Sequence, residues 1–430
     1  MRVERLDWDG SDAAIFARSL RAAAAPSPDL PERVAAIIAR VAERGDEALE
    51  ELTARFDATE ERPPSLRVAR AELDHAVERI DPELRDALML AAANIRAVAE
   101  AELPRDPEPT ELPQGQRVRV VHRPVAAAGV YAPGGRAAYP SSVLMCCIPA
   151  AVAGVERIAL CTPPDPHGLV NPVVLAAAAL AGATEVYAVG GAQAIAALAL
   201  GTATIDPVDV IAGPGNEWVA EAKRQLYGRV GIDAIAGPSE LVVVADAGTD
   251  PSSIALDLLA QAEHGAESPV FAFAADEELL ERVSALVAAL ATSRPSVKDA
   301  RAVLVKTPSI EAALELSDAL APEHLELRFA GADEALAAER VAGCVFVGEG
   351  ASTAFGDYAA GSNHVLPTGG AARFSGPLGP EAFMRRTSVV EIPGAAADAL
   401  AGPVERIARD EGLPVHGESA RAAAPSEVDS

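Results

Sequence analysis

The 430-residue sequence is poor in lysine, in cysteine and in aromatic residues. Only Lys223, Lys298 and Lys306 are lysines, there are four cysteines, and aromatic residues make up 4% of the chain. Acidic residues number 63 against 36 basic ones, so the formal charge is −27. A surface of this sign repels phosphate polymers and anionic lipids, and the arginines are scattered singly among acids. We therefore expect the chain to bind neither nucleic acid nor a membrane surface.

The cysteines form no recognisable pattern. Cys146, Cys147, Cys161 and Cys344 include no C-x-x-C pair and no regular spacing, which predicts neither a disulfide framework nor a sulfur-rich zinc site. The first residues, MRVERLDWDGSD, are charged from the second position and lack the apolar stretch of a signal peptide. We therefore expect a cytoplasmic protein with reduced thiols.

Two long uncharged segments, 137–155 and 186–205, raise the question of a membrane span. The first contains Pro140 and Pro149, and the second carries Gly190 and Gly191 near its middle, where a spanning helix would favour leucine and isoleucine. An apolar strand, a glycine turn and an alanine-rich helix in succession are typical of a buried parallel α/β core. We expect that core and no membrane span.

The pattern of apolar residues divides the chain into regions. Residues 30–103 have helical spacing, and 104–116, rich in Pro and Glu, indicate a linker. Apolar runs then alternate with helical patterns, at 118–125, 157–164, 185–191, 208–215, 241–246, 269–274, 302–307 and 344–349. This alternation predicts right-handed βαβ crossovers and two doubly wound domains. After about residue 379 the strand signal fades; a helix is expected at 401–412 and disorder at 420–430.

Four glycine-rich junctions follow extended runs, at 129–135, 189–193, 212–218 and 236–240. Such junctions bring backbone N–H groups to a helix N-terminus, where the helix dipole favours a phosphate. None of them is a G-x-G-x-x-G fingerprint, so a dinucleotide is permitted but not shown. Tight turns of an α/β fold are the simpler interpretation of each junction alone.

Several polar residues stand at spacings that suit chemistry. Gln261 and His264 are three apart at the end of an expected helix, so both could reach one ion, although a capping pair is the simpler explanation. Asp357, Asn363 and His364 lie in a glycine-rich loop, 356–370, where either a site or plain loop hydrogen bonding would explain them. Spacing alone does not choose between these alternatives.

Two acid–imidazole pairs stand out. Glu323 and His324 adjoin each other just before an expected strand, and they offer two proton acceptors of different basicity in one small volume. A cap with a partly exposed histidine would be the structural explanation. Glu411 and His416 lie five apart near the chain end, and they matter only if the tail docks into a cleft of its own or another subunit.

Taken together, these segments resemble the histidinol dehydrogenase family. The resemblance is carried by eight blocks in order, 130–135, 139–145, 189–199, 212–224, 231–240, 261–265, 322–327 and 356–370. It implies an α/β fold of two intertwined, incomplete Rossmann-like doubly wound domains, with a helical N-terminal segment and a C-terminal tail. Trp218 stands where the family leads us to expect tyrosine.

The resemblance also implies domain boundaries. We expect an N-terminal segment at 1–25 and a first, discontinuous domain at 26–128 and 239–378 that holds the zinc and catalytic residues. A second domain at 129–238 would bind NAD. A tail at 379–430 would reach the partner subunit of a homodimer.

The activity implied is the last step of histidine biosynthesis, the oxidation of L-histidinol to L-histidine through histidinal, with two NAD and one Zn²⁺. The catalytic residues would be Glu323 and His324. The NAD contacts would be Tyr131, Gln193 and Asn216. The zinc ligands would be Gln261, His264, Asp357 and His416. The substrate contacts would be Ser239, Gln261, His264, His324, Asp357, His364, Glu411 and His416, with Glu411 and His416 contributed by the neighbouring subunit.

Chemistry supports this set of residues while leaving alternatives open. Removing four electrons from an alcohol requires two hydride transfers and an added water, so one base is not enough. Imidazole, carboxylate and amide ligands leave zinc willing to accept further nitrogen ligands from a substrate. A zinc- and NAD-dependent dehydrogenase of another small polyol, a silent NAD-binding regulator, a structural interaction protein and a cysteine-based mechanism are the alternatives.

Overall fold

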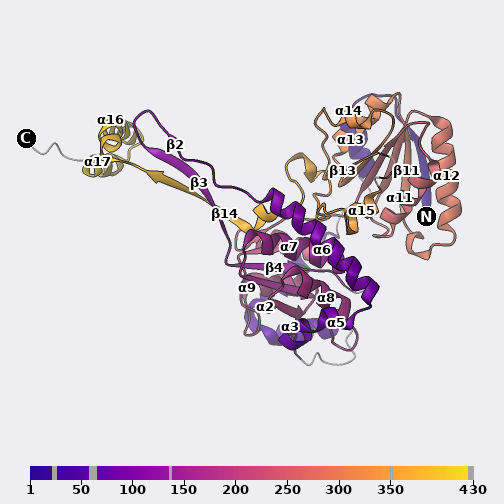
Figure 1. The fold of residues 1–430 in the computed structure, drawn as a ribbon, viewed down its shortest axis with the longest axis horizontal. Helices are drawn as coiled ribbons and strands as arrows, with labels where there is room; N and C mark the ends of the chain where they lie inside the picture. Colours follow the sequence, from indigo (N-terminus) through magenta and orange to yellow (C-terminus); the bar gives the residue numbers. More distant parts are fainter. Residues whose placement is uncertain (22–26, 58–64, 135–137, 349, 351, 425–430) are drawn as a thin grey trace, which may run out of the picture. The chain divides into compact units, whose positions relative to one another are not determined.

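The computed structural model describes residues 1–21, 27–57, 65–134, 138–348, 350 and 352–424 (Figure 1). Its contacts divide the chain into two compact units. The first comprises Met1–Glu102 and Ala126–Phe383, and the second comprises Leu103–Val125 and Met384–Ser430. Each unit is treated by itself below. The expected domain boundaries at 25, 128, 238 and 378 stay a prediction.

Sheet A of the first unit is entirely parallel, with spatial order β1-β11-β10-β9-β12-β13. Its strands are β1 (Arg2–Asp7), β9 (Leu241–Ala245), β10 (Val270–Ala274), β11 (Arg301–Lys306), β12 (His324–Arg328) and β13 (Cys344–Val347). Among the five strands from β9 to β13, β9 comes first in the chain and lies in the middle, with β10 and β11 on one side and β12 and β13 on the other. This is the doubly wound arrangement. The sequence did not predict β1, because its charged residues occupy an edge that is only partly buried.

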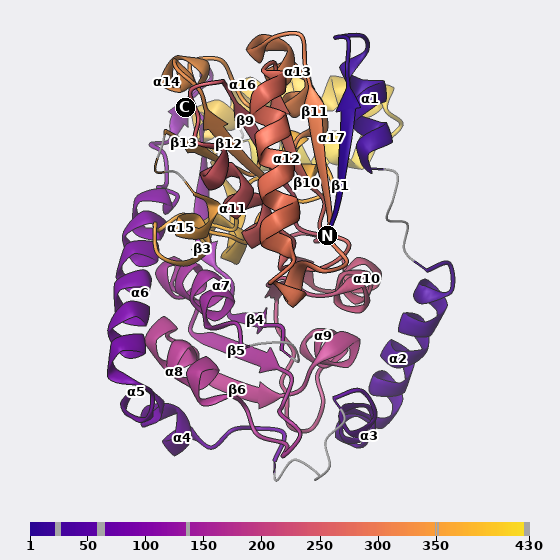
Figure 2. The ribbon, with the colours of Figure 1, turned by 90° about the vertical axis from the view of Figure 1, so that its right-hand side faces the viewer.

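Helices cover both faces of sheet A, as the near-continuous apolar strands require. Helices α11 (Pro251–Ala262) and α12 (Glu277–Ala291) cover one face (Figure 2). Helices α1 (Ala13–Arg21) and α13 (Ile310–Leu320) cover the other. The side chains of Asp250, Asp276 and Ser309 accept backbone N–H bonds at the starts of α11, α12 and α13. These caps satisfy donors that a helix leaves free at its start.

Sheet B of the first unit is also parallel, with order β6-β5-β4-β7-β8. Its strands are β4 (Ala127–Tyr131), β5 (Arg157–Thr162), β6 (Glu185–Ala188), β7 (Val210–Ala212) and β8 (Gly231–Ile232). The connecting helices are α7 (Pro140–Ala153), α8 (Pro172–Ala181), α9 (Gly191–Leu200) and α10 (Glu217–Leu226). The predicted α/β class with doubly wound sheets is thus confirmed, and each sheet has the strand order of a Rossmann-like half.

The helical region expected at 30–103 is confirmed as well. It forms α2 (Leu30–Arg44), α3 (Asp46–Phe56), α4 (Arg70–Asp74), α5 (Ala76–Arg79) and α6 (Pro82–Glu102). Helix α2 packs its apolar face into the core beside α9 and α10. The remaining short elements of this unit are α14 (Ala332–Ala335), α15 (Thr353–Tyr358) and the 3₁₀ turns at Pro295–Val297, Ala371–Arg373 and Pro380–Phe383.

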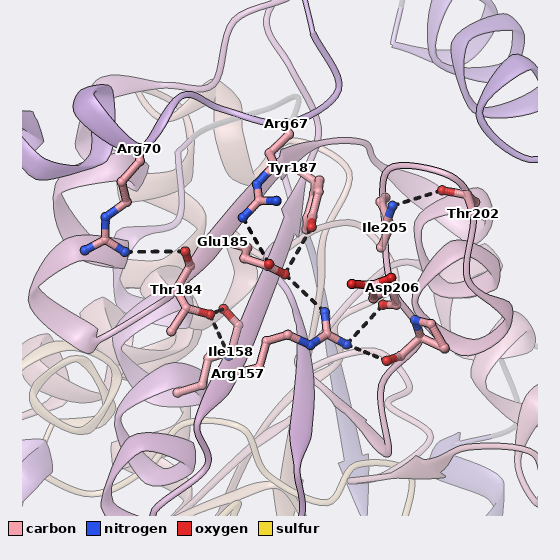
Figure 3. Close-up of polar contacts among 11 residues, drawn as sticks. Arg67, Arg70, Arg157, Ile158, Thr184, Glu185, Tyr187, Thr202, Ile205 and Asp206 are labelled. Atoms are coloured by element: carbon pink, nitrogen blue, oxygen red, sulfur yellow. Dashed lines mark hydrogen bonds and ion pairs between the residues drawn. The ribbon is translucent and has the colours of Figure 1, made fainter.

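A polar cluster fixes the amino ends of β5 and β6 (Figure 3). The Glu185 carboxylate accepts hydrogen bonds from Arg67, Arg157 and the Tyr187 hydroxyl at 3.0–3.1 Å. Arg157 also donates to the backbone oxygen of Asp206 at 3.1 Å. Arg67 and Arg157 both pair with Glu185, so we assign this cluster to the stability of the sheet.

The second unit holds an antiparallel sheet, β14-β3-β2, formed by β2 (Thr110–Glu111), β3 (Arg117–Pro124) and β14 (Met384–Glu391). Helices α16 (Gly394–Asp410) and α17 (Pro414–Ala423) pack against each other. The expectation that strands end near 379 was wrong, because β14 is largely exposed and lacks an apolar pattern. The expected disorder at 420–430 was wrong for 420–423, which continue α17; residues 425–430 lie outside the described residues.

The two long uncharged segments contain α7 and α9, and the second segment also includes most of β6. These helices are 14 and 10 residues long, and both are buried almost throughout. A spanning helix needs about 20 apolar residues. Across the described part of the chain, no helix combines the length and apolar character needed to cross a membrane.

Candidate active site

The Glu323–His324 pair lies at the amino end of β12, which is between β9 and the edge strand β13 in sheet A. His324 is the first residue of β12 and stands in register with Leu241, the first residue of β9. Ser239 and Glu240 immediately precede β9, so the four side chains gather where these two strands begin. Open α/β sheets usually bind ligands at the carboxyl ends of their strands. Sheet A therefore presents its candidate chemistry at the opposite end.

A chain of hydrogen bonds ends on the Glu323 carboxylate. Gln261 Nε2 donates to Ser239 Oγ, and Ser239 Oγ donates to Glu323 Oε2. The backbone N–H of Glu240 donates to the same oxygen at 2.8 Å. Gln261 and Glu323 are buried. The Gln261 side-chain oxygen has no hydrogen-bond partner among the described residues, so this amide oxygen is available to a ligand.

The His324 imidazole is oriented by the backbone. Its Nδ1 lies 3.1 Å from the carbonyl oxygen of Glu240, to which it donates, and its Nε2 lies 3.6 Å from Asp357 Oδ1. The described residues offer Nε2 no hydrogen bond, although the ring is only 2% exposed. Burial lowers the pKa of His324, but the nearby Glu323 and Asp357 carboxylates outweigh it and raise that pKa well above its ordinary value. The ring therefore favours its protonated form, and it can act as a base only after it has released the proton from Nε2.

Arg21 and Glu240 support this arrangement, although neither residue was predicted to belong to the site. Arg21 donates through Nε and Nη2 to the two Glu240 carboxylate oxygens at 3.1 and 2.9 Å. Arg21 Nη2 also reaches the carbonyl oxygen of Ala321 at 3.3 Å. Among the described residues, Ala321 is the only non-glycine with positive φ, at +49°. Its left-handed conformation ends α13 and turns the chain toward Glu323.

Two further candidate metal ligands lie just after α11 and on α15. His264 follows the end of α11 in an exposed turn, so it is not on the helix itself as the spacing had suggested. Asp357 is on α15 and not in an open loop. Burial raises the pKa of Asp357, but the imidazoles of His324, His364 and His264 outweigh it and hold that pKa below its ordinary value. Asp357 therefore remains a carboxylate facing three imidazoles.

His364 and Asn363 connect this loop to its surroundings. His364 Nδ1 donates to the carbonyl oxygen of Asp357 at 2.8 Å, and its Nε2 lies 3.2 Å from Ser142 Oγ on α7. Burial lowers the pKa of His364, which favours the neutral ring. Asn363 donates to the carbonyl oxygen of Met145 at 2.7 Å. Asn363 thus has a structural role, while His364 could exchange its Ser142 contact for a ligand.

The candidate metal ligands are of types that bind zinc, although the described residues do not form a complete coordination site. The described residues contain no group of three or more His, Cys, Asp or Glu arranged to hold a metal. Gln261, His264 and Asp357 nevertheless offer an unpartnered amide oxygen, an imidazole and a carboxylate within the first unit. These donor types fit a borderline ion such as Zn²⁺. His416, on α17, and Glu411, which caps α16, are exposed on the second unit.

A buried charge network ties the elements that carry these donors. Arg328 donates to Glu326 at 2.7 Å and also to Asp257, which lies on α11. Glu326 accepts the Thr353 backbone N–H at 3.0 Å and its hydroxyl at 2.8 Å, at the start of α15. Glu326 is two residues from His324 on β12, so both point to the same face of the strand. The network therefore fixes α11 and α15 relative to His324.

The expected cofactor contacts gather at the carboxyl end of sheet B, where the strand order reverses. Tyr131 ends β4, Gln193 lies in the first turn of α9, and Asn216 caps α10 by accepting two backbone N–H bonds. The Tyr131 hydroxyl accepts the N–H of Gly191 at 3.1 Å. Gly135, at the end of one matching segment, lies outside the described residues.

The loop between β7 and α10 is held tightly. A Cβ on Gly213 would lie 2.1 Å from the Tyr131 carbonyl oxygen, so only glycine fits. Lys223 is 2% exposed and donates to the Gly213 carbonyl oxygen and to Asp233, each at 2.6 Å. Close backbone approach at a helix start fits a dinucleotide phosphate.

The cysteines do not fit a nucleophile. Burial raises the pKa of the Cys147 thiol to about 12 and that of Cys146 and Cys161 well above the ordinary value. Cys344 pairs across the sheet with His324, a neighbour that sequence order did not reveal. Burial is again the largest effect and raises the Cys344 pKa. A protonated thiol is a poor nucleophile.

Comparison with known proteins gives a consistent result. The model of the family described as histidinol dehydrogenase matches residues 21–423. A histidinol dehydrogenase of Rhodospirillum rubrum is 48% identical over 426 residues, covering 97% of this chain and 98% of the relative. One of Parasynechococcus marenigrum is 44% identical and covers 96% of each. The crystal structure of histidinol dehydrogenase from Elizabethkingia anophelis matches with a TM-score of 0.89 at 32% identity, covering 97% of both chains.

Proposed function

The chain belongs to the histidinol dehydrogenase family, and on that premise we propose that it oxidises L-histidinol to L-histidine in two successive hydride transfers to NAD. The observation that carries this proposal is the buried His324, whose Nε2 has no hydrogen-bond partner among the described residues, beside a carboxylate held by Ser239 and Glu240. Such a pair supplies the two proton acceptors that an alcohol-to-acid oxidation needs.

In the first oxidation, His324 Nε2 takes the hydroxyl proton of histidinol while a hydride leaves its carbon for NAD. The products are histidinal, NADH and a protonated imidazole. The Nδ1–H bond to the Glu240 carbonyl keeps Nε2 free for this transfer. NAD accepts the hydride, and the chain contributes position and electrostatics.

In the second oxidation, water adds to the aldehyde and a second hydride leaves. Glu323 removes a proton from the attacking water. His324, after it has released the proton of the first oxidation to solvent, accepts the hydroxyl proton of the hydrate as hydride passes to a second NAD. The whole reaction consumes one water and two NAD and gives histidine with two NADH. Ser239 keeps the Glu323 carboxylate aimed at the water, because its hydroxyl donates to that group.

Gln261, His264, Asp357 and His416 would hold one Zn²⁺, which polarises bound groups and orients the substrate amine and imidazole. The unpartnered Gln261 oxygen supports this assignment. Ser239 and His364 would contact the substrate, and the Glu411 carboxylate would pair with its cationic amine or imidazole. Tyr131, Gln193 and Asn216 would contact NAD.

We further propose a cytoplasmic homodimer in which Glu411 and His416 serve the neighbouring subunit's site. Both residues are exposed, Glu411 just after α16 and His416 on α17, where a partner could be reached. All four cysteines are free, which fits a reducing compartment.

The proposal is tested by following NADH formation from the purified chain with histidinol, with and without added Zn²⁺. We expect two NADH per histidinol, and we expect exhaustive chelation to abolish turnover. Full activity after chelation would contradict the zinc role. Turnover of another polyol in preference to histidinol would favour a paralogous dehydrogenase, and no NADH from any alcohol would refute the function.

A further inference from the structure

The main chain of Glu240 contacts both residues of the proposed catalytic pair. Its backbone N–H donates to Glu323 Oε2 at 2.8 Å. Its carbonyl oxygen accepts from the His324 backbone N–H and from His324 Nδ1, each at 3.1 Å. Three hydrogen bonds therefore join the main chain of one residue to Glu323 and His324. A shift of Glu240 would move both of them together.

The side chain of Glu240 fixes this main chain, because it is buried and bonded from two sides. Glu240 is 4% exposed, and Arg21 donates to both of its carboxylate oxygens, at 3.1 and 2.9 Å. The Gly369 backbone N–H is a further donor to the same carboxylate. Burial raises the pKa of Glu240, and Arg21 opposes that shift. Without this counter-charge, the buried carboxylate would be costly to keep in place.

Arg21 also contacts the turn that leads into the catalytic pair. Its Nη2 lies 3.3 Å from the carbonyl oxygen of Ala321, two residues before Glu323. Ala321 has a φ of +49°, and this left-handed conformation costs energy for a residue that has a Cβ. The bond from Arg21 offsets part of that cost, so Arg21 stabilises the turn as well as Glu240.

The Arg21 guanidinium has a defined place of its own. Arg21 is the last residue of α1, which packs against α13 (Figure 2). A Cβ on Gly370 would collide with Arg21 Nη1, so the glycine leaves the room that the guanidinium occupies. The Arg21 side chain is 21% exposed. A small cation can therefore reach this place from solvent if the side chain is removed.

We propose that Arg21 is a positioning residue for both oxidations. Through the Glu240 carboxylate and the Ala321 carbonyl oxygen, it holds Glu323 and His324 in the geometry that proton transfer needs. The inference rests on the proposed function, and it gives the N-terminal segment a part in catalysis to which no motif pointed. Because Arg21 acts through Glu240, its loss should slow the chemical steps more than it weakens substrate binding.

The test is the single-turnover rate of each oxidation, from histidinol and from supplied histidinal, in the zinc-loaded Arg21→Ala chain with NAD. We expect both rates to fall by about a hundredfold, the scale of a misplacement of about 1 Å. KM for histidinol should change much less. Parent-like rates in Arg21→Ala would overturn the inference.

Chemical rescue separates positioning from stability of the fold. Methylguanidinium added to Arg21→Ala should restore part of both rates, because it can occupy the place of the missing guanidinium. Arg18→Ala is the control, since it removes an exposed arginine from the same helix. It should keep the parent rates and gain nothing from methylguanidinium. Failure of methylguanidinium to raise either rate of Arg21→Ala would assign Arg21 to the fold alone and overturn the inference.

Arg21→Lys keeps the positive charge, so it tests the inference even where Arg21→Ala does not fold. One ammonium cannot reproduce the forked pair of bonds, so both rates should still fall by about tenfold. If the parent chain forms NADH from histidinol and Arg21→Lys keeps its rates, the inference is overturned and the proposed function stands. If the parent chain forms no NADH from histidinol, the proposed function itself fails.

Discussion

Asp57 illustrates how a single residue can work against stability. A carboxyl group whose folded pKa is about 6, above its unfolded value near 3.9, is ionised at neutral pH in a place that disfavours charge. A raised folded pKa gives stability that is fully present below the unfolded pKa and is lost as the pH rises through about 6. The ionised Asp57 therefore destabilises the cofactor-free chain at pH 8. The groups near it are Tyr131 on β4 and the uncharged Gly190.

We therefore predict that Asp57→Asn raises the Tm of the cofactor-free chain at pH 8, by about one or two degrees for a chain of this size. The gain should shrink as the pH falls from about 6 toward 4, because the parent carboxyl then becomes neutral. Thermal unfolding of the parent chain and the variant from pH 5 to pH 8 measures this difference in Tm. Asp86→Asn, which changes an exposed carboxylate, is the control. A variant less stable than the parent at pH 8 would show that Asp57 has a stabilising partner.

Glu323 allows the two oxidations to be separated. The amide of Glu323→Gln can still accept from Ser239 Oγ and the Glu240 N–H, so the site should keep its shape. It cannot take a proton from water, so oxidation of supplied histidinal should slow by about a hundredfold, the usual scale for a lost general base. Oxidation of histidinol to the aldehyde should change much less. Equal loss in both single-turnover rates would argue against separate roles.

The sequence predicted residues only where they stand in recognisable motifs. Glu323, His324 and Gln261 stood out because an acid, an imidazole or an amide at a junction suggests chemistry. Glu240 and Asp57 were missed, since an isolated carboxylate looks the same whether it faces solvent or a buried arginine. Only the fold shows that Arg21 lies against Glu240 and that Asp57 Oδ2 is buried without a hydrogen-bond partner among the described residues.

At the scale of elements, periodicity predicted the buried parts well and the edges poorly. The interior strands of both sheets are continuous apolar runs, so β5, β9, β10 and β11 were expected. Strands β1 and β14 are held by backbone pairing, with side chains that are mostly polar and partly or fully exposed. An apolar pattern cannot reveal a strand whose side chains meet water.

Helix α15 depends on the buried network at its start, which leads to a prediction. Thr353→Val removes the hydroxyl bond to Glu326 but keeps the backbone bond, so α15 should stay folded but be less well placed. Because α15 carries Asp357, zinc affinity should fall by about tenfold, the lower end for residues that support metal ligands.

Chelator competition on the purified chain measures this affinity. Thr353→Ser keeps a hydroxyl and should restore binding, while a loss of fold alone would lower stability without this rescue. Zinc affinity unchanged in Thr353→Val would show that Glu326 does not position Asp357.

At the scale of the whole molecule, the ligand set is divided between the two compact units. Gln261, His264 and Asp357 belong to the first unit, and Glu411 and His416 belong to the second. The resemblance to the family suggests this set of ligands. Gln261 and His416 are 155 residues apart in the sequence, and that separation does not show which subunit's tail serves which site. Subunit mixing can answer that question.

We predict that two variants, each defective in forming histidine when expressed alone, restore histidine formation when they share a dimer. Glu323→Gln disables the first unit of one subunit, and His416→Ala disables the tail of the other. If tails serve the neighbouring subunit, the mixed dimer combines an intact first unit with an intact tail in one of its two sites. Random pairing makes half the dimers mixed, so co-expression should give about one quarter of the parent kcat per site. If each tail serves its own subunit, every site keeps one defect and the mixture stays as inactive as the separate variants. Each variant expressed alone sets that baseline, and sedimentation of the mixture verifies that dimers form.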